Sequence, residues 1–214
     1  MSSCCDRGGY GKFFNERFAQ RIARRYRKRG LDKPSRRIAD FLRSRGLEGA
    51  TVLEIGGGLG EIQVELLKAG AAHAVNLELS PEYDTEARRL AEENGVVDRI
   101  DRRLHDIAAD PVAVESADVV VLNRVVCCYP DYERLLGAAA DHARRLLIFS
   151  YPPRNLVSRT FVGLVNATFA LRRSEFRSFA HPPAAMLAVL DRRGLTRTYE
   201  HHGLVWQIAG LERA

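Results

Sequence analysis

The stretch Val52-Leu-Glu-Ile-Gly-Gly-Gly-Leu-Gly60 joins a short apolar run to a glycine-rich turn, and a helical pattern follows it. Glycine at positions 56, 58 and 60 permits backbone angles that other residues avoid, and it lets a ligand approach the main chain closely. The N–H groups at the start of the following helix are available to such a ligand. This stretch therefore predicts a strand, a turn and a helix that together bind a nucleotide-like molecule.

The same alternation continues on the C-terminal side of the glycine turn. Short apolar runs alternate with helical stretches, which predicts βα units and a mostly parallel sheet. The expected strands are 51–55, 74–77, 100–104, 118–122 and 146–150, and the helices between them are 61–68, 81–93 and 132–144. Helices at 156–171 and 183–192 and an antiparallel strand pair at 196–201 and 204–211 are expected to close the chain.

Two further helices are expected ahead of the glycine turn, at about 13–29 and 34–46. In the first, Phe14, Phe18, Ile22 and Tyr26 recur every four residues, so they share one face of an amphipathic helix. We therefore divide the chain into a helical lid or extension at 1–48 and a ligand-binding domain at 49–214.

Composition and length place limits on the class of protein. The chain has 214 residues, 46% of them hydrophobic, which is enough for a sizeable single core. No run approaches the roughly 20 apolar residues that cross a bilayer, and the first residues lack the apolar run of a signal peptide. We therefore expect a cytoplasmic protein without a membrane span, with its four cysteines present as thiols.

The net charge of +6 is concentrated at one end of the chain. Residues 1–50 hold 14 Lys and Arg against 5 Asp and Glu, a net charge of +9, so the remainder carries −3. This segment is either a solvated helix face or a basic flap that attracts an anionic substrate, a nucleic acid or a membrane surface.

Three acidic residues narrow the choice of ligand. The third glycine of the dinucleotide-binding fingerprint lies three residues after the second, whereas Gly58 and Gly60 are two apart, and Glu54 precedes the turn. A carboxylate there can hold the ammonium group of S-adenosylmethionine, which a nicotinamide cofactor lacks. Glu78, at the end of the next strand, is placed to bind the ribose hydroxyls, and Asp106 can accept a hydrogen bond from the adenine amino group.

The segment Glu54-Ile-Gly-Gly-Gly-Leu-Gly60 resembles the acid-x-Gly-x-Gly-x-Gly signature of the class I S-adenosylmethionine-dependent methyltransferases, and the likeness extends over about residues 50 to 150. The resemblance implies an α/β, Rossmann-like sheet of seven strands in the order 3-2-1-4-5-7-6 with the last strand antiparallel. It also implies that Asp106 and Ile107 flank adenine and that Asn123 and Arg124 lie beside the methyl donor. The complete set of residues expected at the cofactor is Glu54, Gly56, Gly57, Gly58, Gly60, Glu78, Leu79, Asp106, Ile107, Asn123 and Arg124.

The acceptor is expected to be a small or medium-sized metabolite methylated on oxygen. Residues 151–183, which we call the acceptor wall, combine an apolar helix with basic loops, and this arrangement is distantly similar to that of magnesium-protoporphyrin O-methyltransferases. Tyr151 and Arg154 of this wall, with Tyr10 of the lid, are the candidate substrate-binding residues. His181 and Tyr129 are the candidate catalytic residues, since a methyl transfer from a sulfonium requires alignment and, for some acceptors, removal of a proton.

Three alternatives remain open from the sequence. The basic N-terminal helices suit an RNA methyltransferase, although the Asn/Asp-Pro-Pro-Tyr/Phe sequence of many nucleic-acid methylases is absent from 123–130. The pairs Cys4-Cys5 and Cys127-Cys128 could meet in a thiol-rich site for a metal or an arsenic-type substrate, or they could be buried thiols. A non-catalytic module that only binds the cofactor is the third alternative.

Overall fold

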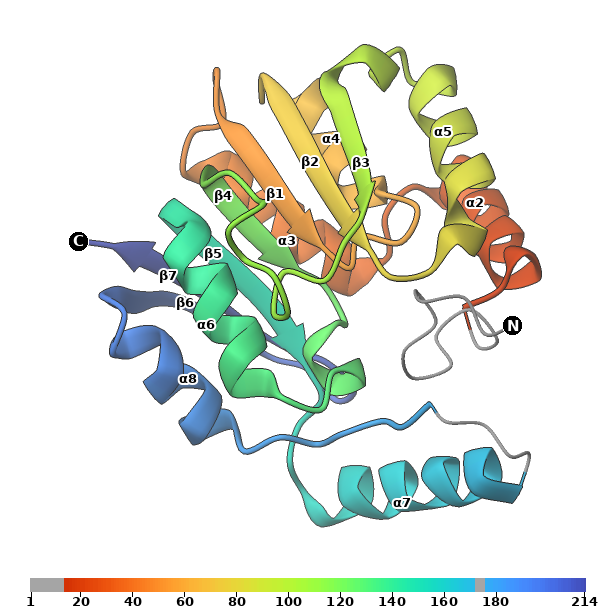
Figure 1. Cartoon of the computed structure of the whole chain (residues 1–214), viewed down its shortest axis with the longest axis vertical. Coiled ribbons are helices and arrows are strands. Elements are labelled where there is room, and N and C mark those ends of the chain that lie inside the picture. The colour runs from red at the N-terminus through yellow and green to blue at the C-terminus, as the bar shows by residue number, and fades with distance from the viewer. Residues whose placement is uncertain (1–13, 172–175) are drawn as a thin grey trace.

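The chain folds around one seven-stranded sheet (Figure 1). The computed structural model describes residues 14–171 and 176–214. The strands are β1 (Thr51–Ile55), β2 (His73–Glu78), β3 (Ile100–Leu104), β4 (Ala117–Leu122), β5 (Ala143–Tyr151), β6 (Leu195–His202) and β7 (Gln207–Arg213). Their order is β3-β2-β1-β4-β5-β7-β6, and β7 runs antiparallel to both of its neighbours, which confirms the predicted topology.

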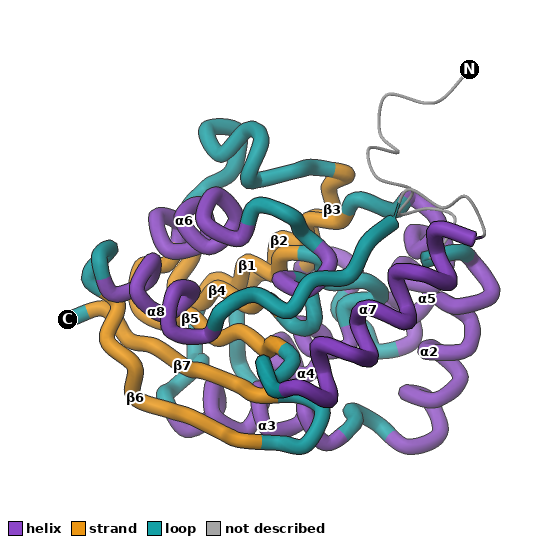
Figure 2. The backbone as a smooth tube through the Cα atoms, turned by 90° about the horizontal axis from the view of Figure 1, so that it is seen from below, coloured by secondary structure: helices purple, strands orange, loops and turns teal. Residues whose placement is uncertain are grey.

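The helices lie on both faces of this sheet (Figure 2). They are α2 (Glu16–Arg29), α3 (Lys33–Ser44), α4 (Glu61–Lys68), α5 (Asp84–Glu93), α6 (Tyr132–His142), α7 (Leu156–Leu171) and α8 (Pro183–Asp191). Helix α7 runs along one edge of the molecule, beyond the carboxyl end of β5 (Figure 1). Among the described residues, no helix is at once long enough and apolar enough to cross a bilayer.

Alternate residues of the central strands belong to two separate hydrophobic clusters. Val119 and Val121 of β4 belong to the cluster beneath α2 to α5, whereas Val120 and Leu122 belong to the cluster beneath α6 and α8. Successive side chains of a strand point to opposite faces, so a run of apolar residues in β4 is required to cover a sheet that is buried on both sides.

Helices α2 and α3 pack into the first of these clusters. Ile38 and Leu42 of α3 are fully buried there, together with Ala19 and Ala23 of α2. The sequence predicted 1–48 as a region separate from the ligand-binding domain. The described part of that region shares its core with the sheet, and its role as a lid stays a prediction.

The buried face of α2 agrees only in part with the expected one, since Tyr26 belongs to the core cluster and Phe14 and Ile22 pack against it. The cluster takes Ala19, Ala23 and Tyr26, whereas Phe18 stays 36% exposed. Small side chains let α2 approach α5 closely, and the larger apolar side chains turn toward the cavity described below. The helix also begins later than expected, because Asn15 caps it by accepting a hydrogen bond from the Phe18 N–H.

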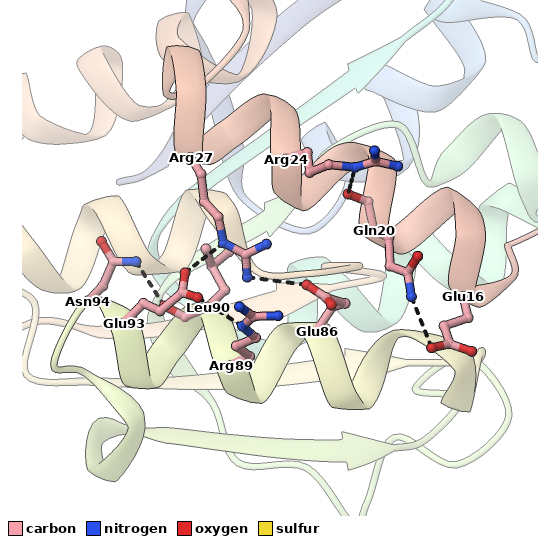
Figure 3. Close-up of polar contacts among 9 residues, drawn as sticks. All are labelled: Glu16, Gln20, Arg24, Arg27, Glu86, Arg89, Leu90, Glu93 and Asn94. Atoms are coloured by element: carbon pink, nitrogen blue, oxygen red, sulfur yellow. Dashed lines mark hydrogen bonds and ion pairs between the residues drawn. The ribbon is translucent and has the colours of Figure 1, made fainter.

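Charged side chains fasten α2 to α5 (Figure 3). The Arg27 guanidinium lies 2.6 Å from the Glu93 carboxylate and 3.2 Å from that of Glu86. Part of the positive charge of the N-terminal segment is therefore paired with carboxylates of the same molecule.

The second strand of the closing pair begins later than expected. Strand β7 begins at Gln207 and not at 204, because Gly203 donates its N–H to the Trp206 carbonyl and the residues between them form the turn. The remaining predicted strands and helices are confirmed, with ends that move by up to three residues.

Candidate active site

A cavity of about 210 Å³ opens at the carboxyl ends of β1, β2 and β4. In an open α/β sheet this edge is the usual place for a ligand. Of the predicted cofactor residues, those in the cavity lining are Glu54, Gly56, Gly57, Gly58, Glu78, Leu79, Asn123 and Arg124. The opposite wall contains Phe14, Phe18 and Ile22, so the apolar stripe expected on the first helix covers this cavity.

The glycine turn has the conformation that its sequence predicts. Gly56, Gly58 and Gly60 have φ angles of +62°, +57° and +79°, a region that residues with a Cβ rarely adopt. At Gly57 the limit is space, because a Cβ there would lie 2.5 Å from Asn76 Nδ2. Side chains are excluded from the turn for both reasons, which keeps its main chain open to the cavity.

Glu78 connects the end of β2 to the glycine turn. Its Oε2 accepts the Gly58 N–H at 2.8 Å, and its Oε1 accepts the N–H groups of Leu79 and Ser80 at 2.7 and 3.0 Å. Three backbone donors therefore fix the position and orientation of a carboxylate in the cavity lining.

Glu54 and Glu61 place two further carboxyl groups at the cavity. Glu54 is buried and accepts the Gln63 N–H at 3.3 Å. Burial, reinforced by the charge of Glu61, raises the pKa of Glu54 to about 8. Burial also raises the pKa of Glu61. A cation placed between these two groups would favour their ionised forms.

Buried polar atoms without a partner gather around the same turn. Within the described residues these atoms are Gln63 Oε1, Asn76 Nδ2, Arg102 Nη2 and Arg124 Nε. Asn76 Nδ2 lies beside Gly57, and Arg102 donates through Nη1 to the Gly58 carbonyl at 2.7 Å. Of these four residues, only Arg124 belongs to the cavity lining.

Asp106 takes part in a local network instead of lining the cavity. Its Oδ1 accepts the N–H groups of Ala108 and Ala109, and the Tyr129 hydroxyl donates to both carboxylate oxygens at 3.0 and 3.2 Å. Burial and the charge of Asp106 raise the pKa of Tyr129 to about 12. Asp106 therefore holds the Tyr129 hydroxyl, and the Tyr129 side chain is part of the cavity wall. The catalytic role predicted for Tyr129 stays a prediction.

Arg124 is the residue on which several elements converge. It has a φ of +63°, an unusual angle for a residue with a side chain, and its N–H donates to Ser150 Oγ at 2.8 Å. Its guanidinium pairs with Asp32, the N-cap of α3, and lies 5.3 Å from the centre of the Trp206 ring. Such strain is frequently stored at functional sites.

Neighbouring side chains join α3 to the end of β4. Asn123 donates through Nδ2 to Ser35 Oγ at 3.1 Å and accepts from Ser150 Oγ at 2.9 Å. Asp32, Ser35 and Ser150 were not predicted at the site. Asp32 could have been found as an N-cap ahead of Pro34, but its pairing with Arg124 depends on the tertiary structure.

The other predicted residues lie farther from the cavity. Of the described ones, Gly60, Ile107, Tyr151, Arg154 and His181 are not part of its lining. Tyr151 is 1% exposed and stacks on Phe149 in the core, while Arg154 is exposed. Tyr10, Cys4 and Cys5 lie outside the described residues.

His181 serves as an anchor in the acceptor wall. Its Nε2 lies 3.0 Å from the Tyr129 carbonyl oxygen, and its ring stacks on Phe179. Burial lowers the pKa of His181, which favours the neutral ring. These contacts hold the wall against the segment that follows β4, and the catalytic role predicted for His181 stays a prediction.

Comparison with known proteins identifies the domain. Residues 53–146 match the family model described as a methyltransferase domain. Ribosomal protein L11 methyltransferase from Enterobacter sp. (strain 638) is 39% identical over 77 residues, 36% of this chain and 25% of that protein. The homologue from Photorhabdus laumondii is 37% identical over 98 residues, 46% of this chain and 32% of that protein. The chain thus spans about a quarter to a third of the length of these curated relatives.

Solved structures extend the likeness to nearly the whole chain. Magnesium protoporphyrin IX methyltransferase from Synechocystis PCC 6803 with bound SAH has a TM-score of 0.74 at 19% identity, covering 95% of this chain and 97% of that one. An O-methyltransferase family 2 protein from Planctomyces limnophilus has a TM-score of 0.66 at 20% identity, covering 92% and 62%. The chain has the class I methyltransferase fold. Its residues 53–146 are similar to a methyltransferase domain, and the neighbour from Synechocystis binds SAH.

Proposed function

We infer that the protein transfers a methyl group from S-adenosylmethionine to an oxygen atom of a small or medium-sized, partly apolar and anionic metabolite. The observation that supports this most directly is the cavity itself. Its floor is the glycine turn with Glu54 and Glu78, and its roof is Phe14, just ahead of α2, together with Phe18 and Ile22 of α2. A polar, cation-binding floor suits the cofactor, and an apolar roof suits the flat parts of cofactor and acceptor.

In this proposal the cofactor is held by residues at the ends of β1 and β2. Glu78 accepts the ribose hydroxyls in addition to its backbone donors, and the glycine turn lets the nucleoside approach the main chain. Glu54 and Glu61 attract the ammonium group of the methionine moiety. The bound cofactor supplies a methyl group on a positively charged sulfur, which is reactive without further activation.

The protein's own contribution is alignment of the acceptor and exclusion of water. Arg124 lies in the cavity lining, and its guanidinium is at the N-terminus of α3. There it can pair with a carboxylate of the acceptor. Cys128 and Tyr129 form the neighbouring wall. Positioning of this kind supplies much of the rate of a transfer whose donor is already activated.

The comparisons bear differently on the acceptor. The match to ribosomal protein L11 methyltransferases covers at most about a third of those proteins and less than half of this chain. The likeness to magnesium protoporphyrin IX methyltransferase covers 95% of this chain and 97% of that one. We therefore favour a small-molecule acceptor over a protein.

A nucleic-acid acceptor is less favoured by the described contacts of the basic N-terminal segment. Arg27, Arg43 and Arg45 each form an ion pair with a carboxylate from a later part of the chain. Pairing of this kind lowers the positive potential that a phosphate backbone would meet.

The test is incubation of the protein with a metabolite extract and methyl-labelled S-adenosylmethionine, with mass spectrometry of the products. We expect a labelled small molecule with the methyl on oxygen. Arg124→Gln should lower kcat/KM for that product, and Arg154→Ala tests the predicted acceptor contact of the wall. Label found on nitrogen or sulfur would contradict O-methylation, and label found only in RNA or protein would contradict the small-molecule class.

A further inference from the structure

Two adjacent thiols lie in the segment that follows β4, at the cavity wall. Cys127 and Cys128 end a short 3-10 turn, Val126–Cys128, and their Sγ atoms are 3.6 Å apart. Both thiols are also within hydrogen-bonding distance of the Arg124 carbonyl oxygen, at 3.5 and 3.7 Å. The turn thus places both sulfur atoms on the same side of the backbone, toward one acceptor.

The two thiols differ in access. Cys128 is half-buried and belongs to the cavity lining, whereas Cys127 is 6% exposed and lies behind it. A reagent that enters the cavity therefore meets Cys128 first, and the second sulfur is within reach once the first bond has formed.

The two thiols also differ in acidity. The hydrogen bond from Cys128 lowers the pKa of Cys127, while the same bond together with burial raises the pKa of Cys128. Because the thiolate is the nucleophile and the ligand form of cysteine, the pair holds one proton more tightly and releases the other more readily.

This geometry suits some thiophilic ligands and not others. A structural zinc ion takes four ligands in a tetrahedron, and within the described ranges no group of three or more His, Cys, Asp or Glu side chains could hold a metal. A trivalent arsenical needs only two thiols, which it binds as a ring. Two sulfur atoms already close together and facing one way need little rearrangement to form it.

We propose that Cys127 and Cys128 form a dithiol site in the wall of the cofactor cavity that captures a trivalent organoarsenical and thereby blocks the cofactor. For an arsenical oxide R–As=O, two S–As bonds form, the As=O bond is lost, and its oxygen leaves as water with the two thiol protons. Arsenic stays trivalent, so the step needs no oxidant or reductant.

Capture at this site obstructs the cavity because of what lies next to it. Val125, which precedes the turn, is in contact range of the glycine turn, since a Cβ on Gly56 would lie 2.7 Å from Val125 Cγ2. Cys128 and Gly56 line the same cavity. An aryl group carried by arsenic on Cys128 occupies space that the cofactor requires.

The experiment uses phenylarsine oxide as the probe on the full chain, reduced with a phosphine and freed of small thiols. Intact-mass spectrometry should show one phenylarsenic per chain that survives excess glutathione and is removed by 2,3-dimercaptopropanol. The affinity for S-adenosylhomocysteine should fall by about tenfold or more in the loaded protein. Conversely, saturating S-adenosylhomocysteine should slow the uptake of arsenic.

Matched variants locate the site. The Cys4→Ser/Cys5→Ser double variant should bind phenylarsine oxide as the parent does, whereas Cys128→Ser and Cys127→Ser should each lose the glutathione-resistant adduct. Since Cys127 is buried, Cys127→Ala provides a second test of that position if the serine variant does not fold. An adduct that persists in Cys128→Ser, or one that requires Cys4 or Cys5, would overturn the proposal. Arsenic uptake that leaves S-adenosylhomocysteine binding unchanged would overturn its placement in the cavity.

Discussion

The carboxylate of Glu78 accepts the backbone N–H of Gly58 at 2.8 Å, and this bond joins the end of β2 to the middle of the glycine turn. The two residues are 20 positions apart in the sequence, and each belongs to a different predicted element. Because the other carboxylate oxygen accepts two more N–H groups, Glu78 is oriented before any ligand arrives. A preorganised carboxylate loses little conformational freedom on binding.

The first prediction concerns this carboxylate. Glu78→Ala should weaken S-adenosylhomocysteine binding by about ten- to a hundredfold, the range expected for loss of a hydrogen bond to a charged group. Calorimetry measures the change, with the exposed neighbour Glu82→Ala as the control. Equal affinities of parent and Glu78→Ala would refute the assigned role, and binding of NADH in place of S-adenosylhomocysteine would refute the cofactor.

The second prediction concerns the pH dependence that Glu54 introduces. Its pKa is about 8 in the folded protein against an ordinary value of 4.5, so between these values the folded state binds more protons than the unfolded state. Its contribution to stability is therefore fully present below pH 4.5 and is lost as the pH rises through 8. Glu54→Gln should flatten the fall of Tm between pH 5 and pH 9 that calorimetry records in the parent.

Ligand binding should shift the protonation of Glu54 in the direction opposite to folding. The positively charged ammonium group of S-adenosylhomocysteine favours the ionised form of Glu54, so binding near pH 7 should release a proton. Calorimetry in buffers of different ionisation enthalpy measures this release, which Glu54→Gln should abolish. Identical proton release by parent and variant would assign it to another group.

Much of the fold follows from features that the sequence displays directly. The apolar run of β4 and the glycine turn after β1 are local patterns, and local patterns predicted the elements well, whereas the order of the strands came from the family resemblance. Glu54 was predicted because an acid precedes the glycine turn, and Glu78 was predicted because it ends the next strand of the sheet.

What the sequence did not reveal depends on contacts between distant segments. The apolar stripe of Phe14, Phe18 and Ile22 predicts an amphipathic helix, but periodicity does not distinguish a face that meets the core from one that meets a cavity. Asp106 is acidic and follows β3 as expected, yet its oxygens are occupied by Ala108 and Ala109 N–H groups and by Tyr129. A hydrogen-bond partner 23 residues away cannot be inferred from strand position alone.

The third prediction concerns the ion pair between Asp32 and Arg124. Burial alone would raise the pKa of Asp32, but hydrogen bonds from Arg124 and Ser35 lower it to about 2, against an ordinary value of 3.8. The pair therefore adds stability above pH 3.8 that is lost as the pH falls toward 2. Asp32→Asn, which still caps α3, should lower the free energy of unfolding at pH 7 by about 1–2 kcal/mol.

Urea unfolding at pH 7 and at about pH 3 distinguishes the stability that the Asp32 charge contributes from the stability that its N-cap hydrogen bond contributes. The difference between parent and Asp32→Asn should shrink at the lower pH, where the parent's carboxylate begins to be protonated in the folded state. Asp40→Asn, at a side chain that is 60% exposed, is the control. A difference independent of pH would show that the ion pair contributes nothing.

The last prediction separates the two parts of the N-terminal region. Because Ala19 and Ala23 of α2 are fully buried in the core, removal of 1–29 should destabilise the sheet along with the lid. Removal of 1–13 leaves α2 intact, so the Tm should change little while turnover falls, as expected if Tyr10 belongs to the predicted lid. Phe18→Ala should behave in the same way, since Phe18 lines the cavity and is 36% exposed, with a stability change below about 1 kcal/mol. Arg21→Ala, at an exposed position of the same helix, is its control. Full turnover without residues 1–13 would contradict a lid formed by those residues. If Phe18→Ala still weakened S-adenosylhomocysteine binding, α2 alone would cover the cavity.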